Sequence, residues 1–97
     1  MTNSIYAANF AGHYSCGKVI TYDKDNNLYA KESIVSWFRG FYSGVNWTQG
    51  FESIDYPDDD DSIYYAVVKF CKDSPLKDSA DASIYIYHEI TGNYLND

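Results

Sequence analysis

The sequence predicts a small all-α domain of about four helices, with one disulfide between the N-terminal segment and the third helix. Apolar residues repeat at intervals of three and four in the central segment, and the same interval returns before the second cysteine. The two cysteines, Cys16 and Cys71, lie on either side of the central segment. At 97 residues, 45% of them hydrophobic, the chain has the size of one domain, which we place over residues 1–97.

The N-terminal part is expected to contain little regular structure. Between Ser4 and Ile20 the apolar residues are scattered and glycines interrupt any long element, so we expect a short helix or a turn that carries Cys16. The segment DKDNN, from Asp23 to Asn27, predicts a polar turn, because Asp and Asn side chains bind their own backbone and tolerate left-handed conformations.

The clearest element is a central helix from about Leu28 to Asn46, whose apolar residues form one stripe. Two glycines beside the stripe cost helix propensity, about 1 kcal/mol each. They indicate either close approach of another segment or, for Gly44, a frayed last turn. The stripe consists of Ile34, Trp37, Phe38, Phe41, Tyr42 and Val45, and the residues expected to pack against other helices are Trp37, Phe38, Gly40, Phe41 and Gly44.

The next stretch, from Asn46 to Asp61, predicts a long loop that contains Pro57 and four consecutive aspartates. Ser62 or Asp61 is expected to cap a helix that ends near Lys72, with its acidic start suited to the helix dipole. The apolar residues of this helix repeat at intervals of three and four and place the second cysteine towards the core: Ile63, Ala66, Val67, Phe70 and Cys71.

A last helix is expected between the start signal Ser74-Pro75 and the stop signal Gly92. Leu76, Ala80, Ile84 and Tyr87 would form its buried stripe. The run from Ile84 to Tyr87 also alternates like a strand and is rich in strand-forming residues, so a strand stays open as an alternative.

The two cysteines admit two interpretations. As a disulfide they would close most of the chain into one loop, stabilise it by about 4 kcal/mol and indicate an oxidising compartment. As free thiols they would be buried small apolar residues of a cytosolic protein. We favour the disulfide, and with it an oxidising compartment and export of the protein. No secretion signal begins the chain, so we expect Met1 to stand where a signal peptide has been removed.

The charge balance narrows the choice of partners. Fourteen acidic and seven basic residues give a net charge of −7, which argues against nucleic acids and anionic membrane surfaces. A basic or neutral protein partner fits, and a homodimer is left open. No apolar run is long enough to span a membrane. The residues expected to contact a partner are Trp47, Tyr56, Asp58, Asp59, Asp60 and Asp61.

Candidate chemistry is sparse, and we expect neither an enzyme nor a cofactor. His13 lies near Cys16 and would form a nucleophilic pair with it only if that cysteine were a free thiol. His88, near a helix end, is more typical of a solvated side chain. The aspartates lack the alternating spacing and the glycine of an EF-hand, so calcium is the weaker alternative to a solvated loop, and no metal is expected.

Two motifs resemble a known superfamily. The segments WFRGFYSGVN, starting at Trp37, and FCKDSPL, starting at Phe70, together with Cys16 and the later ADA stretch, are similar to small periplasmic proteins related to the HdeA acid-stress chaperone and to Rap1a-type immunity proteins. The resemblance extends from Cys16 to Tyr87. It implies an all-α fold with the two cysteines joined, export to the periplasm and a function in binding proteins.

The resemblance implies two specific functions. The first is an immunity-type inhibitor of a secreted antibacterial effector, and the second is an acid-stress holdase that binds unfolded clients. An adaptor module without inhibitory function is a third interpretation. We favour the inhibitor, because the first cysteine lacks the tryptophan that precedes it in the chaperone and lies instead in Tyr14-Ser15-Cys16-Gly17.

Overall fold

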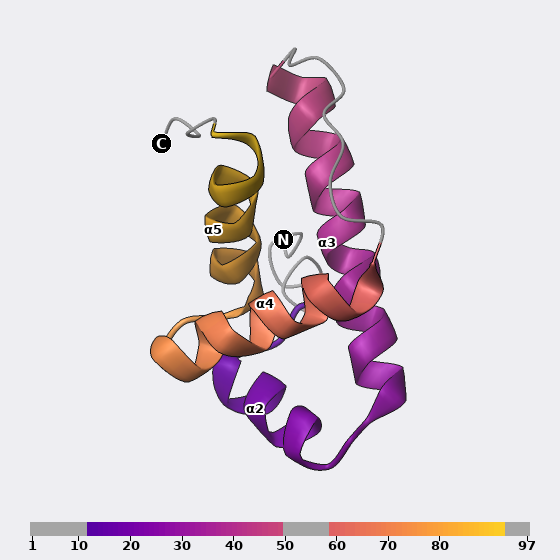
Figure 1. Ribbon diagram of the computed structural model, residues 1–97, viewed down its shortest axis with the longest axis vertical. Helices are drawn as coiled ribbons and strands as arrows, with labels where there is room; N and C mark the ends of the chain where they lie inside the picture. The colour runs from indigo at the N-terminus through magenta and orange to yellow at the C-terminus, as the bar shows by residue number, and fades with distance from the viewer. Residues whose placement is uncertain (1–11, 50–58, 93–97) are drawn as a thin grey trace, which may run out of the picture.

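The computed structural model describes residues 12–49 and 59–92, and these contain four helices and no strand of a sheet (Figure 1). The helices are α2 (Cys16–Lys24), α3 (Leu28–Gln49), α4 (Asp60–Asp73) and α5 (Ser79–Thr91). The prediction of a small all-α fold is confirmed. The run Ile84 to Tyr87 lies within α5, so the strand alternative is wrong.

The disulfide between Cys16 and Cys71 is present and joins α2 to α4 across 55 residues. Both cysteines are completely buried, and their Cα atoms are 4.8 Å apart. The predicted link between the N-terminal segment and the third helix of the chain is therefore confirmed, and the free-thiol alternative is wrong. The bond lies in the core, where α4 crosses α2 and also contacts α3 and α5 (Figure 1).

Short polar interactions set the ends of α2 and the start of α3. The Ser15 hydroxyl caps α2 by accepting a hydrogen bond from the Lys18 N–H. Asn26 adopts a left-handed conformation with φ 55°, and the Asn27 side chain accepts from the Ala30 N–H. The predicted polar turn is therefore present, but it is shorter than expected because α2 extends to Lys24.

Helix α3 is longer than predicted and reaches Gln49. Its stripe faces the core as expected, with Ile34, Phe38 and Tyr42 buried. The expected close packing at Gly40 and Gly44 is wrong for the described part of the chain. Both glycines are exposed, and no described atom lies within 4 Å of where a Cβ would be. Because α3 continues past Gly44, a frayed last turn does not account for it either.

Helix α4 begins two residues earlier than predicted, because Asp59 is its N-cap in place of Ser62 or Asp61. The Asp59 carboxylate accepts a hydrogen bond from the Asp61 N–H at 2.9 Å and another from the Ser62 hydroxyl at 3.0 Å. These bonds satisfy a helix-terminal N–H group and place the next two aspartates in the first turn, near the positive end of the helix dipole. The buried residues of α4 are Ile63, Val67, Val68 and Cys71.

Helix α5 begins at Ser79, so the predicted start at Ser74-Pro75 is wrong. Asp78 and Asp81 form a capping box that fixes the helix start. The residues before it pair with the N-terminal segment, since the Cys16 N–H donates to the Lys77 carbonyl at 2.9 Å. Gly92 ends the helix in the left-handed conformation, as predicted.

The later start of α5 also corrects its predicted buried stripe. Leu76 lies outside the helix and is 100% exposed, and Ile84 is 37% exposed. Tyr87 is buried as predicted. The face of α5 that packs on the core is formed by Ser79, Ala82, Ser83, Ile86 and Tyr87.

Candidate functional site

Two of the aspartates expected to contact a partner, Asp60 and Asp61, lie in the first turn of α4 and connect it to α3. Asp59 caps α4, Asp60 forms an ion pair with Arg39 and Asp61 forms one with Lys31. Both cations lie on α3, so the pairs hold the start of α4 against that helix. The negative charge of these carboxylates is partly neutralised within the chain and is weaker as a partner-binding surface than the sequence suggests.

The same contact reaches α2 through Tyr64. Its hydroxyl donates to the Asp23 carboxylate at 3.1 Å, and the Lys31 ammonium lies 5.5 Å from its ring centre. Burial, and then the hydrogen bond and charge of Asp23, raises the pKa of Tyr64 to about 12. The hydrogen bond from Lys31 to Asp61 raises the pKa of Lys31.

Trp47 is 89% exposed near the end of α3 and is separated from the aspartates. It lies eight residues beyond Arg39 and sixteen beyond Lys31, which corresponds to ~12 Å and ~24 Å along a helix. The described residues therefore do not bring Trp47 together with Asp60 and Asp61. Tyr56 and Asp58, the other expected contact residues, lie outside the described part of the chain.

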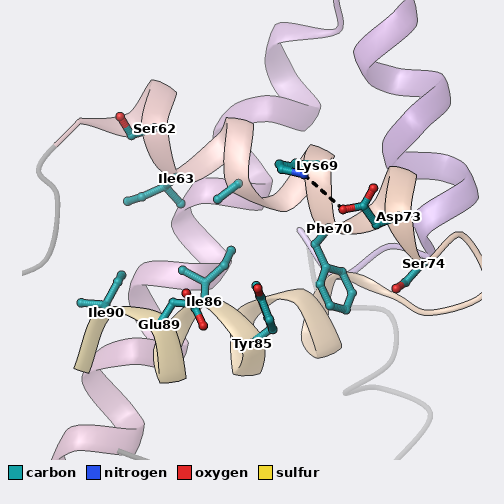
Figure 2. Close-up of a pocket in the computed structure, with 11 residues that line it drawn as sticks. Ser62, Ile63, Lys69, Phe70, Asp73, Ser74, Tyr85, Ile86, Glu89 and Ile90 are labelled. Carbon is teal, nitrogen blue, oxygen red and sulfur yellow. Dashed lines mark hydrogen bonds and ion pairs between the residues drawn. The ribbon is translucent and has the colours of Figure 1, made fainter. Parts of the chain in front are cut away.

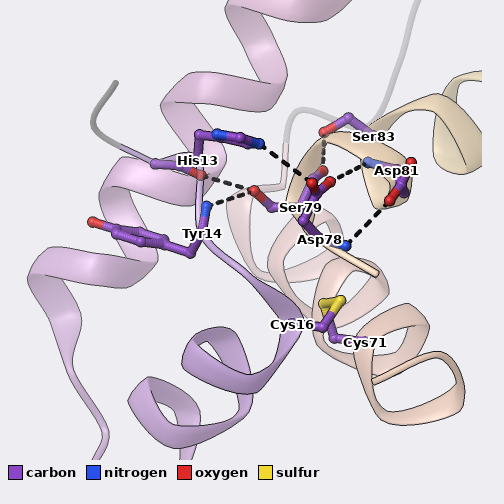
Figure 3. A network of polar contacts seen from close by, with 9 residues as sticks. His13, Tyr14, Cys16, Cys71, Asp78, Ser79, Asp81 and Ser83 are labelled. Atoms are coloured by element: carbon purple, nitrogen blue, oxygen red, sulfur yellow. Dashed lines mark hydrogen bonds and ion pairs between the residues drawn. A yellow bond between two sulfur atoms is a disulfide. The ribbon is translucent and has the colours of Figure 1, made fainter. Parts of the chain in front are cut away.

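A polar network anchors the segment before α2 to the start of α5 (Figure 3). The Ser79 hydroxyl donates to the Gly12 carbonyl and accepts from the Tyr14 N–H, and the Ser79 N–H donates to the Tyr14 carbonyl. The His13 ring nitrogen Nε2 lies 3.6 Å from the Asp78 carboxylate. The network lies beside the disulfide, so it and the covalent bond restrain the same segment (Figure 3).

His13 has a structural position in this network and no cysteine thiol to activate. Its ring stacks on Trp37, with ring centres 5.7 Å apart, and Trp37 stacks in turn on Phe41. Since Cys16 is in a disulfide, the nucleophilic His–Cys pair considered from the sequence is wrong for the oxidised protein. Within residues 12–49 and 59–92, no three His, Cys, Asp or Glu side chains lie together as metal ligands would.

Several large apolar side chains are exposed on the described surface. Tyr65 on α4 is 69% exposed and Tyr85 on α5 is 50% exposed. Aromatic side chains of this kind are enriched in protein interfaces. The exposed large hydrophobic residues are Leu28, Tyr29, Trp47, Tyr65, Leu76, Ile84 and Tyr85.

A groove of about 510 Å³ lies between α4 and α5 (Figure 2). Its apolar lining comes from both helices, and Phe70 of α4 lies against Tyr85 of α5 with ring centres 5.6 Å apart. Three charged residues, Lys69, Asp73 and Glu89, also line it. The apolar lining residues are Ile63, Ala66, Phe70, Tyr85, Ile86 and Ile90.

The sequence interpretation missed this groove, although its signal was present. The spacing of Ile63, Ala66 and Phe70 predicts that all three lie in the core, yet Ala66 and Phe70 are only half-buried. The spacing of Ile86 and Ile90 by four residues marked the opposite wall. The pattern indicates that both helices have an apolar face. It does not indicate that part of each face lies outside the core and lines a groove.

No family model, curated protein or solved structure matches the chain. The similarity to HdeA-like and Rap1a-type proteins therefore rests on the sequence motifs alone. None of the described helices is long and apolar enough to cross a membrane.

Proposed function

We propose that this chain is an exported, non-enzymatic protein of the periplasm that binds and inhibits a secreted antibacterial effector. The observation that carries the first part is the buried Cys16–Cys71 disulfide. Structural disulfides persist in oxidising compartments and are rare in the cytosol, so a bond in the core of so small a domain supports export.

The exposed side chains support a function in protein binding. Trp47 and Tyr65 are large aromatic residues that are 89% and 69% exposed, and the α4–α5 groove adds a concave apolar surface. The few residues that carry most of the binding free energy in protein interfaces are enriched in Trp and Tyr and lie in well-packed pockets. The net charge of −7 favours a basic partner by accelerating the encounter between the two proteins.

The proposal is tested by isolating the partner. The tagged, oxidised protein is recovered from the periplasm of its source organism at neutral pH, and co-purifying proteins are identified by mass spectrometry. We expect one secreted effector, encoded nearby, whose toxicity is suppressed when the chain is exported with it. An effector whose toxicity is unchanged by saturating amounts of this chain would contradict the proposal, as would recovery without any specific partner.

A matched pair of variants sharpens this test. Trp47→Ala removes an exposed side chain from α3 and should weaken partner binding about tenfold without changing the melting temperature. Ser36→Ala, at another exposed position of α3, is the control and should leave binding unchanged.

The acid-stress holdase is the second candidate, and one observation favours it. Carboxylates hold together several parts of the fold: Asp59 and Asp78 cap helices, and Asp60 and Asp61 join α4 to α3. Protonation at pH 2 to 3 weakens all four interactions and takes the net charge from −7 towards +9, from seven Lys and Arg and two His. A holdase binds hydrophobic dye and suppresses client aggregation at that pH, whereas an inhibitor instead co-purifies with one specific partner at neutral pH.

A further inference from the structure

We propose that the α4–α5 groove binds one amphipathic helix of the partner, with apolar side chains on the groove floor and a basic side chain at Glu89. This inference rests on the proposed function in protein binding and adds the chemistry of the bound segment. The α4–α5 groove is the part of the surface that binds this segment.

The floor of the groove matches the apolar face of a helix. Ile63, Ala66 and Phe70 are spaced by three and four residues along α4, and Ile86 and Ile90 are one turn apart on α5. The two rows of side chains face the same space (Figure 2). Amphipathic helices are recognised in such grooves by apolar side chains at the same intervals.

The backbone chemistry of the groove favours a helix over an extended peptide. Both walls are helices, whose interior N–H and C=O groups are bonded within each helix. An extended segment on this apolar floor would leave its own backbone groups without partners, at a cost in binding free energy. A helix satisfies its backbone internally and can place its apolar face against the floor.

The charges at the rim favour a basic residue on that helix. Lys69 and Asp73 form an ion pair along α4 with a nitrogen–oxygen distance of 3.2 Å, so their charges largely offset each other. Glu89 is exposed on the opposite wall and has no ion-pair partner in the part of the chain that the structure describes. The groove thus presents one uncompensated negative charge on a chain of net charge −7.

The same charges disfavour a second copy of this chain as the occupant. A symmetric dimer through this groove would place the same patch of both copies together. It would bring the uncompensated Glu89 carboxylates of the two copies into one interface, which costs free energy. A basic helix from a different protein meets no such repulsion.

The test uses the full oxidised protein and two synthetic helical peptides that differ only in charge. Both carry leucines at positions i, i+3, i+4 and i+7, with lysine at the remaining positions of one peptide and glutamate at those of the other. We expect saturable binding of the lysine peptide and at least about tenfold weaker binding of the glutamate peptide. NMR shifts on binding should concentrate at Ile63, Ala66, Ile86 and Ile90.

Two pairs of variants separate the groove from general charge attraction. Ala66→Lys places a long side chain on the half-buried floor of the groove and should weaken binding of the lysine peptide about tenfold. Ser36→Lys adds the same charge at an exposed position outside the groove. It should weaken binding of that peptide less than about twofold. Glu89→Gln should weaken binding by about two- to fivefold, and Glu32→Gln on α3 should have no such effect. Circular dichroism confirms that each variant is folded.

Several results would overturn the inference. Equal binding of the two peptides would remove the charge argument, and an Ala66→Lys variant that binds as well as the Ser36→Lys control would place the contact elsewhere. A dimer in sedimentation that is abolished by Ala66→Lys would identify a second copy as the occupant. An effector captured equally by the native chain and Ala66→Lys would refute the groove while upholding the proposed function. Peptide binding that passes every control, without any effector, would refute the inhibitor and uphold the groove.

Discussion

Gly12 lies directly against the backbone of Ser33 on α3. A Cβ built on Gly12 would be 2.1 Å from the Ser33 carbonyl oxygen and 2.7 Å from the Trp37 Cβ. Both distances are too short for a contact of a real Cβ atom. The φ angle of Gly12 is +92°, in a region that residues other than glycine rarely adopt. This is the kind of close approach that the sequence suggested for Gly40 and Gly44, and the structure has it at Gly12, against Ser33 and Trp37 of the same helix.

Gly12→Ala should therefore destabilise the fold by about 2 kcal/mol or more, since the positive φ alone costs ~1–3 kcal/mol and the backbone of α3 cannot move aside. The free energy of unfolding is measured by urea denaturation.

Gly40→Ala is the matched control, because Gly40 is exposed in mid-helix with open space at its Cβ position. It should stabilise the protein by about 0.5–1 kcal/mol through helix propensity. If Gly12→Ala were as stable as the native chain, the contact between Gly12 and α3 would be wrong.

Removing the disulfide should lower the free energy of unfolding substantially. Cys16→Ala with Cys71→Ala opens a link between residues 55 apart, and the expected loss is about 4 kcal/mol from chain entropy, within an observed range of ~2–5 kcal/mol. The loss should be reproduced in the native chain by a reducing agent, and the double variant should not respond to that agent. A reductant that changes the stability of both proteins equally would contradict this assignment.

The parts of the fold that could be predicted from the sequence are those where one local pattern determines the outcome. The stripe containing Ile34, Phe38 and Tyr42 has a single period, and it faces the core as expected. The start of α5 could not be predicted in this way. Ser74-Pro75 is a valid local start signal, but the chain makes a turn there, with the Lys77 N–H donating to the Ser74 carbonyl. The Lys77 carbonyl then accepts from the Cys16 N–H, and the Asp78–Asp81 capping box fixes a later helix start.

The same limit explains the candidate site. The four consecutive aspartates have the composition of a solvated loop, and nothing local to them reveals that Arg39 and Lys31 are spaced along α3 to meet Asp60 and Asp61. Contacts between helices depend on their crossing, which a single apolar period does not specify. The α4–α5 groove was missed for that reason as well.

Stability should fall as the pH rises from about 10 to about 12. Tyr64 has an ordinary pKa of 10.0 and a folded-state pKa of about 12, so the unfolded chain loses this proton first and deprotonation favours unfolding within that window. The raised pKa of Lys31 acts in the same direction, above its ordinary value of 10.5. Below pH 10 the contribution of Tyr64 is fully present.

Tyr64→Phe should flatten this pH dependence, because it removes the titrating hydroxyl that bonds to Asp23. Tyr65→Phe is the control, since Tyr65 is the next residue in α4 and its side chain is 69% exposed. Urea midpoints recorded at several pH values between 9 and 12 measure the effect. An equal pH dependence in the two variants would show that Tyr64 is not responsible.

The Asp78 carboxylate caps α5 and also places a negative charge near His13. Two substitutions separate the contributions of the cap and the charge to stability. Asp78→Ala removes the cap and should cost about 1–2 kcal/mol, whereas Asp78→Asn keeps an N-cap acceptor and should cost much less. The comparison is made by urea denaturation at neutral pH. If both substitutions cost the same, the carboxylate charge rather than the cap stabilises this junction. Because the Asp78 cap fixes the register in which Ser79 meets Gly12 and Tyr14, loss of the cap should also speed hydrogen exchange at the Tyr14 and Cys16 amides.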